Sequence, residues 1–122
     1  PRGYSNGLLT AGKGERILFI AGQIGWVDGR FTTDDFAEQF GIALDNVAAV
    51  VRAAGGDTAS IARMTVYVTD LDAYRSSLGR IGELWRQKIG KHFPVMALVG
   101  VAGLVEPRAR VEIEATAVLP PA

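Results

Sequence analysis

One nine-residue segment near the end of the chain constrains the fold most, because charged or polar residues alternate with apolar ones along it. Residues 110–118 read RVEIEATAV, with a small or branched apolar residue at every second position. Successive side chains of a strand point to opposite sides, so this alternation predicts a β-strand with one buried face. Glu112 and Glu114 share the other face, which must lie toward solvent, an interface or a cleft. A solvated outer face is the simplest interpretation, and it remains the alternative to a functional one.

Two longer segments have the period of amphipathic helices. We expect residues 36–54 and 70–89 to be helical, because their apolar positions recur every three or four residues. The expected boundary residues are Thr32 or Thr33 as N-cap and Gly55 as the stop of the first helix, and Asp70 or Asp72 and Gly90 for the second. By this spacing Trp85 belongs to the core, whereas His92, just beyond the second helix, is expected on the surface.

Short runs of β-branched and aromatic residues complete the predicted architecture. Strands are expected at residues 16–21, 26–31 (around an Asp28-Gly29 hairpin turn), 61–69, 95–101 and 108–119. The resulting β-β-α-β-α-β-β order predicts an α+β fold in one domain, residues 1–122, with two helices on one face of a single sheet. The other face mixes Thr65, Tyr67, Glu112 and Thr116. We therefore expect oligomerisation to cover it.

Composition excludes several classes of function. Thirteen basic residues balance thirteen acidic ones, so neither nucleic acid nor an anionic membrane is an expected partner. The chain has no cysteine and one histidine, which leaves no zinc constellation, and we expect no metal and no cofactor. The longest apolar run, residues 93–105, is shorter than the roughly 20 residues of a membrane helix. Without a secretory leader in this sequence, a cytoplasmic location is expected.

Five blocks of sequence, in this order and spacing, resemble the Rid/YjgF family, also known as the L-PSP endoribonuclease family. The blocks are GYSNG (3–7), FIAGQIG (19–25), ALDNVAAVVRAAGG (43–56), MTVYVTDLDAY (64–74) and HFPVMALVGVAGL (92–104). The resemblance spans nearly the whole chain. It implies a chorismate mutase-like fold, a homotrimer whose sheets form a barrel with the helices outside, and clefts between subunits that hydrolyse small enamines and imines.

The resemblance also assigns roles to individual residues. Glu112 falls at the position of the glutamate that activates water, and Tyr4 at that of the ring that closes the cleft. In the deaminating members, an arginine two residues after the proline of an FPxR-like segment binds the substrate carboxylate. Here residues 93–96 read FPVM, so that position is Met96. A thioether cannot make the charge-assisted, bidentate contact of a guanidinium, which argues against the usual small amino acid enamines as substrates.

Two further polar positions of the family are altered. The serine before the GQI segment is Ala21, and the helix asparagine falls at Leu78 or Gly79. These changes predict a more apolar cleft for a bulkier or less charged ligand; alternatively, Met96 only fills a relic site as adaptable core. The predicted ligand-binding residues are Ala21, Gly22, Gln23, Trp26, Leu78, Met96, Ala97 and Leu98.

Three basic residues lie where they could replace the missing arginine. Arg110 shares the strand face of Glu112, and the preferred interpretation is that the two simply pair. Arg108 and Arg2 are the other candidates. Three functions follow: a hydrolase acting on an enamine or imine, a trimeric small-ligand-binding or regulatory protein without turnover, and an RNA-cleaving activity, for which the neutral charge offers no basic track.

Overall fold

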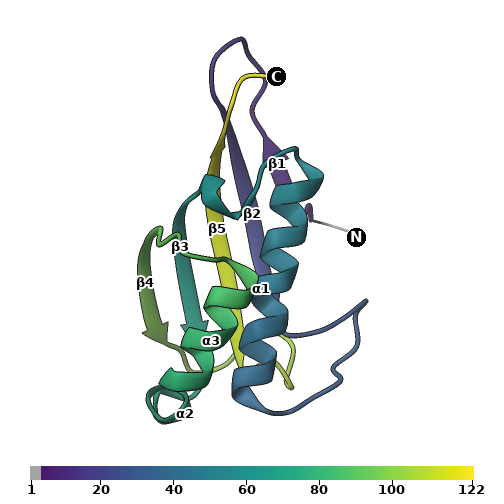
Figure 1. The fold of residues 1–122 in the computed structure, drawn as a ribbon. Helices are drawn as coiled ribbons and strands as arrows, with labels where there is room; N and C mark the ends of the chain where they lie inside the picture. Colours follow the sequence, from purple (N-terminus) through teal and green to yellow (C-terminus); the bar gives the residue numbers. More distant parts are fainter. Residues whose placement is uncertain (1–3) are drawn as a thin grey trace.

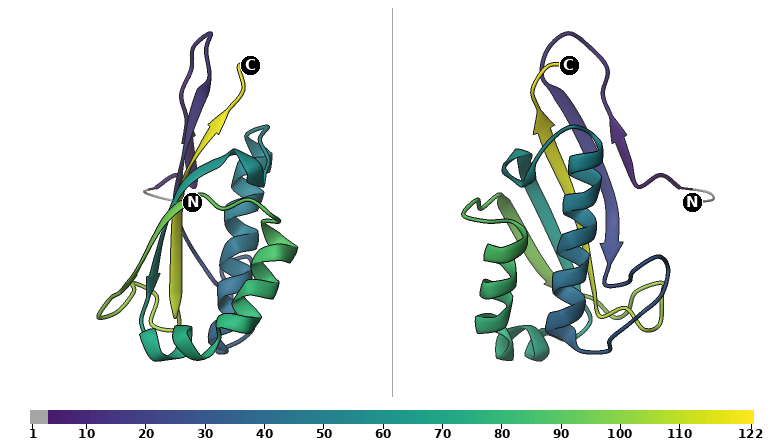
Figure 2. Two further views of the ribbon diagram at one scale, coloured as in Figure 1. Left: turned by 60° about the vertical axis from the view of Figure 1, so that its left-hand side comes forward. Right: turned by 45° about the vertical axis from the view of Figure 1, so that its right-hand side comes forward.

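The computed structural model describes residues 4–122, which form two layers: a five-stranded sheet and helices that cover one of its faces (Figures 1 and 2). In chain order the elements are β1 (Gly7–Leu9), β2 (Arg16–Ile24), α1 (Phe36–Ala53), the 3₁₀ turn η1 (Thr58–Ser60), β3 (Ile61–Val68), α2 (Leu71–Ser76), α3 (Leu78–Lys88), β4 (Val95–Gly100) and β5 (Val111–Leu119). The left view of Figure 2 shows that the opposite face of the sheet carries no helix.

The strands lie in the order β1-β2-β5-β3-β4. Only β3 and β4 are parallel, and the chain between them crosses over through α2 and α3, as a parallel connection requires. All other neighbours are antiparallel. β1 and β4 are therefore the edges of the sheet. No helix within residues 4–122 combines the length and the apolar character needed to cross a membrane.

The predicted alternation along β5 is confirmed. Val111, Ile113, Ala115 and Ala117 are at most 6% exposed, and α1 packs across them and across β2. Fully burying one valine or isoleucine side chain contributes about 1.5–3 kcal/mol, so this face fixes the register of β5. The intervening carboxylates, Glu112 and Glu114, are left on the face without helices.

The first helix begins later than the threonine positions predicted. Neither Thr32 nor Thr33 is its N-cap; Asp35 is, and its Oδ2 accepts a hydrogen bond from the backbone N–H of Glu38 at 2.9 Å. That bond lowers the pKa of Asp35. A charged carboxylate suits a helix N-terminus better than a hydroxyl does. The predicted stop at Gly55 is confirmed, with φ at +91°.

The second predicted helix is broken in two at Ser77. Its N-cap is Asp70, whose Oδ1 accepts from the backbone N–H of Ala73 at 3.0 Å, so the alternative start at Asp72 is wrong. Ser77 has φ −112° and ψ 11°, outside the helical region, and separates α2 from α3. Gly90, with φ at +97°, follows the end of α3 as predicted.

Trp85 lies in the core as expected, but His92 is not a simple surface residue. The Trp85 indole N–H donates to the His92 carbonyl at 3.1 Å. The half-buried His92 ring places Nε2 2.5 Å from the Ile61 carbonyl, so His92 is partly exposed as predicted but also bonds to β3. These bonds tie the segment after α3 to the start of β3.

Residues 26–31 do not form a strand. Asp28 and Gly29 adopt φ values of +51° and +76°, which confirms the hairpin turn, but the only pairing beside it is the isolated bridge between Val27 and Arg30. The last strand begins at Val111 rather than at residue 108, because residues 106–109 form a turn. Sequence reasoning missed the three-residue strand β1 and ended β2 three residues too early, at residue 21.

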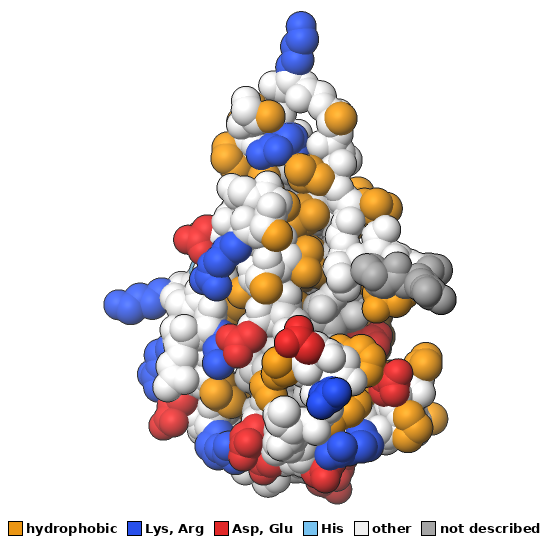
Figure 3. Space-filling model, turned by 90° about the vertical axis from the view of Figure 1, so that its right-hand side faces the viewer, with side chains coloured by type: hydrophobic (Ala, Val, Ile, Leu, Met, Phe, Trp, Pro, Cys, Tyr) orange, Lys and Arg blue, Asp and Glu red, His pale blue; other side chains and the backbone are white. Residues whose placement is uncertain are grey.

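The sheet exposes hydrophobic side chains beside its β1 edge. Leu8 and Phe19 are register partners on β1 and β2, with 64% and 51% of their surfaces exposed. Seen from that edge, hydrophobic side chains extend up the centre of the surface, above a lower end where acidic and basic side chains gather (Figure 3). Exposed apolar surface of this kind marks a face that is suited to association.

Candidate functional site

Glu112 lies over an irregularity in the neighbouring strand. The β2–β5 register shifts between Ile20 and Gln23, so residues 21 and 22 form a bulge opposite β5. A Cβ atom at Gly22 would lie 2.6 Å from Oε2 of Glu112, so the carboxylate rests directly against the Gly22 backbone. We call Ala21, Gly22, Gln23 and Glu112 the bulge site. The structure thus brings four of the predicted site residues together.

The environment of Glu112 favours its protonated form more than water does. Partial burial raises the pKa of its carboxyl group, and the negative charge of Glu114 raises it further. A carboxylate with a raised pKa is a stronger base once it is ionised. The electrostatics of the bulge site therefore make Glu112 a stronger base than an ordinary, fully solvated glutamate.

Tyr67 lies beside Glu112 on the neighbouring strand and hydrogen-bonds to Glu114, and sequence reasoning assigned it no role in the site. It is the register partner of Glu112, yet its hydroxyl donates to Oε1 of Glu114 at 2.5 Å. This hydrogen bond to Glu114 raises the pKa of the Tyr67 phenol. The available signal was the position of Tyr67 on the same polar sheet face, two residues from Thr65.

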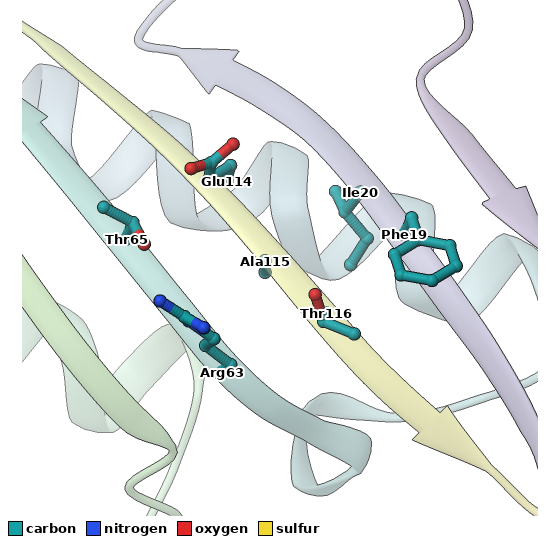
Figure 4. A pocket seen from close by; sticks show the side chains of 7 residues that line it. All are labelled: Phe19, Ile20, Arg63, Thr65, Glu114, Ala115 and Thr116. Carbon is teal, nitrogen blue, oxygen red and sulfur yellow. The ribbon is translucent and has the colours of Figure 1, made fainter.

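A hollow of about 270 Å³ lies beside the bulge site on the helix-free face (Figure 4). It contains Glu114 rather than Glu112, and Arg63, Thr65 and Thr116 supply its other polar side chains. Phe19 closes one side. The polar side chains of this hollow therefore come from β3 and β5, and β2 contributes apolar ones.

The N-terminal segment reaches the bulge through backbone and side-chain hydrogen bonds. The Asn6 carbonyl accepts from the Ala21 N–H at 2.8 Å, and Nε2 of Gln23 donates to the Asn6 side chain at 3.4 Å and to the Ala21 carbonyl at 3.0 Å. Tyr4 precedes Asn6 by two residues and is 60% exposed. The hydrogen bonds to the bulge are made by Asn6 and not by Tyr4, and Arg2 lies outside the described residues.

Met96 and Leu78 lie together in a different place, the α3–β4 pocket. The parallel register pairs Met96 with the buried Met64, which puts both side chains on the helix side of the sheet. The pocket has a volume of about 230 Å³. Its large side chains are those of Phe40, Tyr74, Leu78, Trp85, Phe93 and Met96. The predicted residues Ala97 and Leu98 also line it.

The predicted site residues are therefore divided between two faces of one sheet. Glu112 and Met96 point to opposite sides, so one copy of the chain does not bring them together. Trp26 belongs to neither place. Its ring packs on Phe31 at 5.6 Å, and its carbonyl accepts a hydrogen bond from the Asn46 side chain at 2.9 Å, in the loop after β2.

The expected pairing of Arg110 with Glu112 is wrong. Arg110 lies before β5, its guanidinium is 3.4 Å from Asp70 Oδ2, and it stacks over Phe36 at 5.7 Å. Its backbone N–H donates to the fully buried Gln39, which holds the loop in place. Arg108 likewise pairs with an aspartate, Asp34, at 2.9 Å. Both arginines hold loops together at one end of the sheet.

Comparison with known proteins identifies the family. A family model described as Endoribonuclease L-PSP matches residues 2–119. The chain belongs to this Rid/YjgF family. The resemblance carried by the five sequence blocks is thereby confirmed. Within residues 4–122 no three His, Cys, Asp or Glu side chains cluster closely enough to hold a metal ion.

Similar proteins in the family include named deaminases. The chain is 31% identical to the 2-iminobutanoate/2-iminopropanoate deaminase of Homo sapiens over 120 residues, which cover 97% of this chain and 81% of that protein. Among solved structures it is similar to Rv2704 from Mycobacterium tuberculosis, with 33% identity, a TM-score of 0.76 and coverage of 97% and 88%. Escherichia coli TdcF with bound serine has the same identity and TM-score, with coverage of 94% and 87%.

Proposed function

We propose that this protein is a hydrolase that deaminates small imines and their enamine tautomers. One observation carries the proposal: Glu112, with its raised pKa, rests against the glycine backbone of a β-bulge on an open sheet face. Its human relative is named as a deaminase of two imino acids. A base of this kind is what water attack on an imine requires.

The proposed reaction needs one proton relay. Glu112 takes a proton from water as the water oxygen bonds to the imine carbon, and it passes this proton to the imine nitrogen, which gives a neutral carbinolamine. Glu112 then takes the carbinolamine hydroxyl proton and delivers it to the nitrogen as the C–N bond breaks, so that ammonia leaves and Glu112 is ionised again. The carbon retains the oxygen as a carbonyl. Neither a cofactor nor a metal takes part in this sequence.

A neighbouring copy would complete the site. Glu112 opens on the helix-free face, and the α3–β4 pocket opens beside edge strand β4 on the other face. A ligand can contact both only if the bulge site of one copy meets the pocket of another. We therefore propose a homotrimer of one-domain subunits, residues 1–122, in a chorismate mutase-like barrel whose helices lie outside. In this assembly Tyr4 covers the ligand, and backbone groups of Gly22, Gln23, Ala97 and Leu98 orient it.

Binding without turnover is the second candidate. Met96 stands where the resemblance places a carboxylate-binding arginine, and none of the described residues puts a charged side chain in the lining of the α3–β4 pocket. A structure of the similar protein TdcF contains bound serine, so a ligand-binding role has a precedent in the fold. RNA cleavage has weaker support, because the formal net charge is zero and Nε2 of the single histidine, His92, already bonds to the Ile61 carbonyl.

The test is hydrolysis of imines made in situ from amino acids by an amino acid oxidase, with catalase present and the remaining imine trapped by semicarbazide. We expect the protein to accelerate loss of the imine, and Glu112→Gln to reduce kcat by about 10²- to 10⁴-fold. Glu83→Gln, a change on the exposed surface of α3, should match the unmodified protein. An unmodified protein that binds 2-oxo acids but accelerates no imine would establish the second candidate.

A further inference from the structure

We propose that the α3–β4 pocket binds the side chain of the substrate, and that the preferred imines carry a branched aliphatic or aromatic group. The inference rests on the proposed function and adds the substrate class to it. A pocket built for the smallest imino acids would hold their carboxylate. This pocket offers apolar surface in its place.

Apolar side chains form almost the whole lining of the α3–β4 pocket. Phe40 of α1 and Val66 of β3 form its base, and Trp85 of α3 stacks on Phe93 with ring centroids 6.2 Å apart and planes 4° from parallel. Trp85 Nε1 is already bonded to the His92 carbonyl. Tyr74 brings the single hydroxyl of the lining. Such walls recognise shape and apolar area rather than charge.

Three large apolar side chains stand exposed at this one opening. Leu78, Phe93 and Met96 expose 54%, 72% and 52% of their surfaces. Single exposed hydrophobic residues are ordinary, but three around one pocket leave a contiguous apolar surface for a ligand to cover. Burying a leucine-sized group there should increase affinity by about 10- to 100-fold over a methyl group.

The volume of the α3–β4 pocket favours large substrate side chains over small ones. A cavity of about 150 Å³ accommodates benzene, so about 230 Å³ is sufficient for a phenyl or isobutyl group. A methyl or ethyl group would leave most of the volume unfilled. Because residues 4–122 place no cation in the lining, small imino acids would gain neither packing nor a charge-assisted bond from it.

The pocket can be filled without disturbing the fold. Gly82 lines it from α3, and a Cβ added at Gly82 would meet no atom within 4 Å. Replacing a helical glycine by a better helix former is also favourable for α3. Gly82→Leu therefore blocks the pocket selectively. Gln87→Leu, exposed on the same helix and outside the pocket, is the matched control.

The experiment compares imines derived from leucine, phenylalanine and alanine in the trapping assay. We expect kcat/KM to be about 10- to 100-fold higher for the leucine and phenylalanine imines than for the alanine imine. Gly82→Leu should remove this preference and Gln87→Leu should retain it. Equal rates on all three imines, unchanged in Gly82→Leu, would overturn the inference and leave the deaminase function intact.

A second measurement separates the inference from the proposed function. Binding of two stable 2-oxo acids, 4-methyl-2-oxopentanoate and pyruvate, is measured by isothermal titration with the unmodified protein and both leucine variants. Tighter binding of 4-methyl-2-oxopentanoate that only Gly82→Leu abolishes supports the pocket even if no imine is hydrolysed. Equal affinity for the two acids would overturn the pocket assignment whatever the catalytic result.

Discussion

The bulge site and the α3–β4 pocket lie on opposite faces of one sheet and differ in the chemistry they offer. The bulge site has the half-buried carboxylate of Glu112, and beside it lie the carboxylate of Glu114 and the hydroxyl of Tyr67. Within residues 4–122 the pocket is lined by uncharged aromatic and aliphatic side chains. The comparison teaches that the groups we propose for proton transfer lie apart from those we propose for ligand recognition. Glu112 matches the pattern that the family resemblance implies, and Met96 departs from it.

The largest expected effect distinguishes a methionine of the core from a methionine of the proposed ligand pocket in one cross-strand pair. Met64 and Met96 are register partners, but Met64 is 0% exposed and Met96 is 52% exposed. Met64→Ala should lower the free energy of unfolding by about 2–5 kcal/mol, because it leaves a cavity in the core. Met96→Ala should change it by less than about 1 kcal/mol. Urea denaturation measures both free energies of unfolding. An equal loss in the two variants would show that Met96 is a core residue and would contradict its assignment to a ligand pocket.

Gly22→Ala should damage the bulge site while the fold persists. The new Cβ would lie 2.6 Å from Oε2 of Glu112, and the flexible carboxylate must move away. We expect kcat for imine hydrolysis to fall by about 10- to 100-fold, since a displacement of about 1 Å can have that effect. Gly103→Ala, where an added Cβ meets nothing within 4 Å, is the control. Full activity in Gly22→Ala would contradict the placement of the base.

The charge of Glu114 should shift the acid limb of the pH profile, in addition to the larger effect of burial. Burial and then Glu114 raise the pKa of Glu112, and the base must be ionised to act. Glu114→Gln should move the acid limb of kcat/KM to lower pH, with a change of less than about tenfold at neutral pH. Tyr67→Phe, which retains the Glu114 charge, should move it less. An unmoved limb in Glu114→Gln would show that the limb does not belong to Glu112.

The smallest expected effect is on stability, and its sign follows from the same pKa. The folded state binds a proton at Glu112 more tightly than the unfolded chain does, so ionised Glu112 disfavours folding as pH rises through the raised pKa. Glu112→Gln should therefore raise the melting temperature slightly at pH 8 and leave it unchanged well below the ordinary pKa of a glutamate. A lower melting temperature at pH 8 would contradict the burial assigned to Glu112.

Much of the fold was predictable, because period and hydrophobicity act locally. The alternation along β5 and the stripe on α1 each determine a buried face within one element. The predictions failed at helix boundaries, where a contact or a backbone angle that the periodic pattern does not contain determines the local structure. Asp35 rather than a threonine caps α1, and Ser77 breaks a continuous helical pattern.

The sequence could nominate residues for the candidate site, but it could not predict how they are arranged. Residues 21–23 and Glu112 do meet, yet the bulge that joins them depends on a register shift that no local pattern reveals. The pairing of Arg110 with Glu112 failed because Asp70 and Gln39, far away in the sequence, bind Arg110 instead. The separation of Met96 from Glu112 follows from the parallel register of β3 and β4, which is a property of the topology.

The central claim, that one site draws its base and its pocket from different copies of the chain, has a direct test. Glu112→Gln and Gly82→Leu are unfolded together in equal amounts and refolded, and hydrolysis of the leucine-derived imine is compared with that of each variant alone. In the mixed assemblies half of the bases and half of the pockets are intact. Because each shared site draws its base and its pocket from two different copies, about a quarter of the sites have both, and about a quarter of the unmodified activity should return. Activity no higher than the mean of the two separate variants would contradict a shared site.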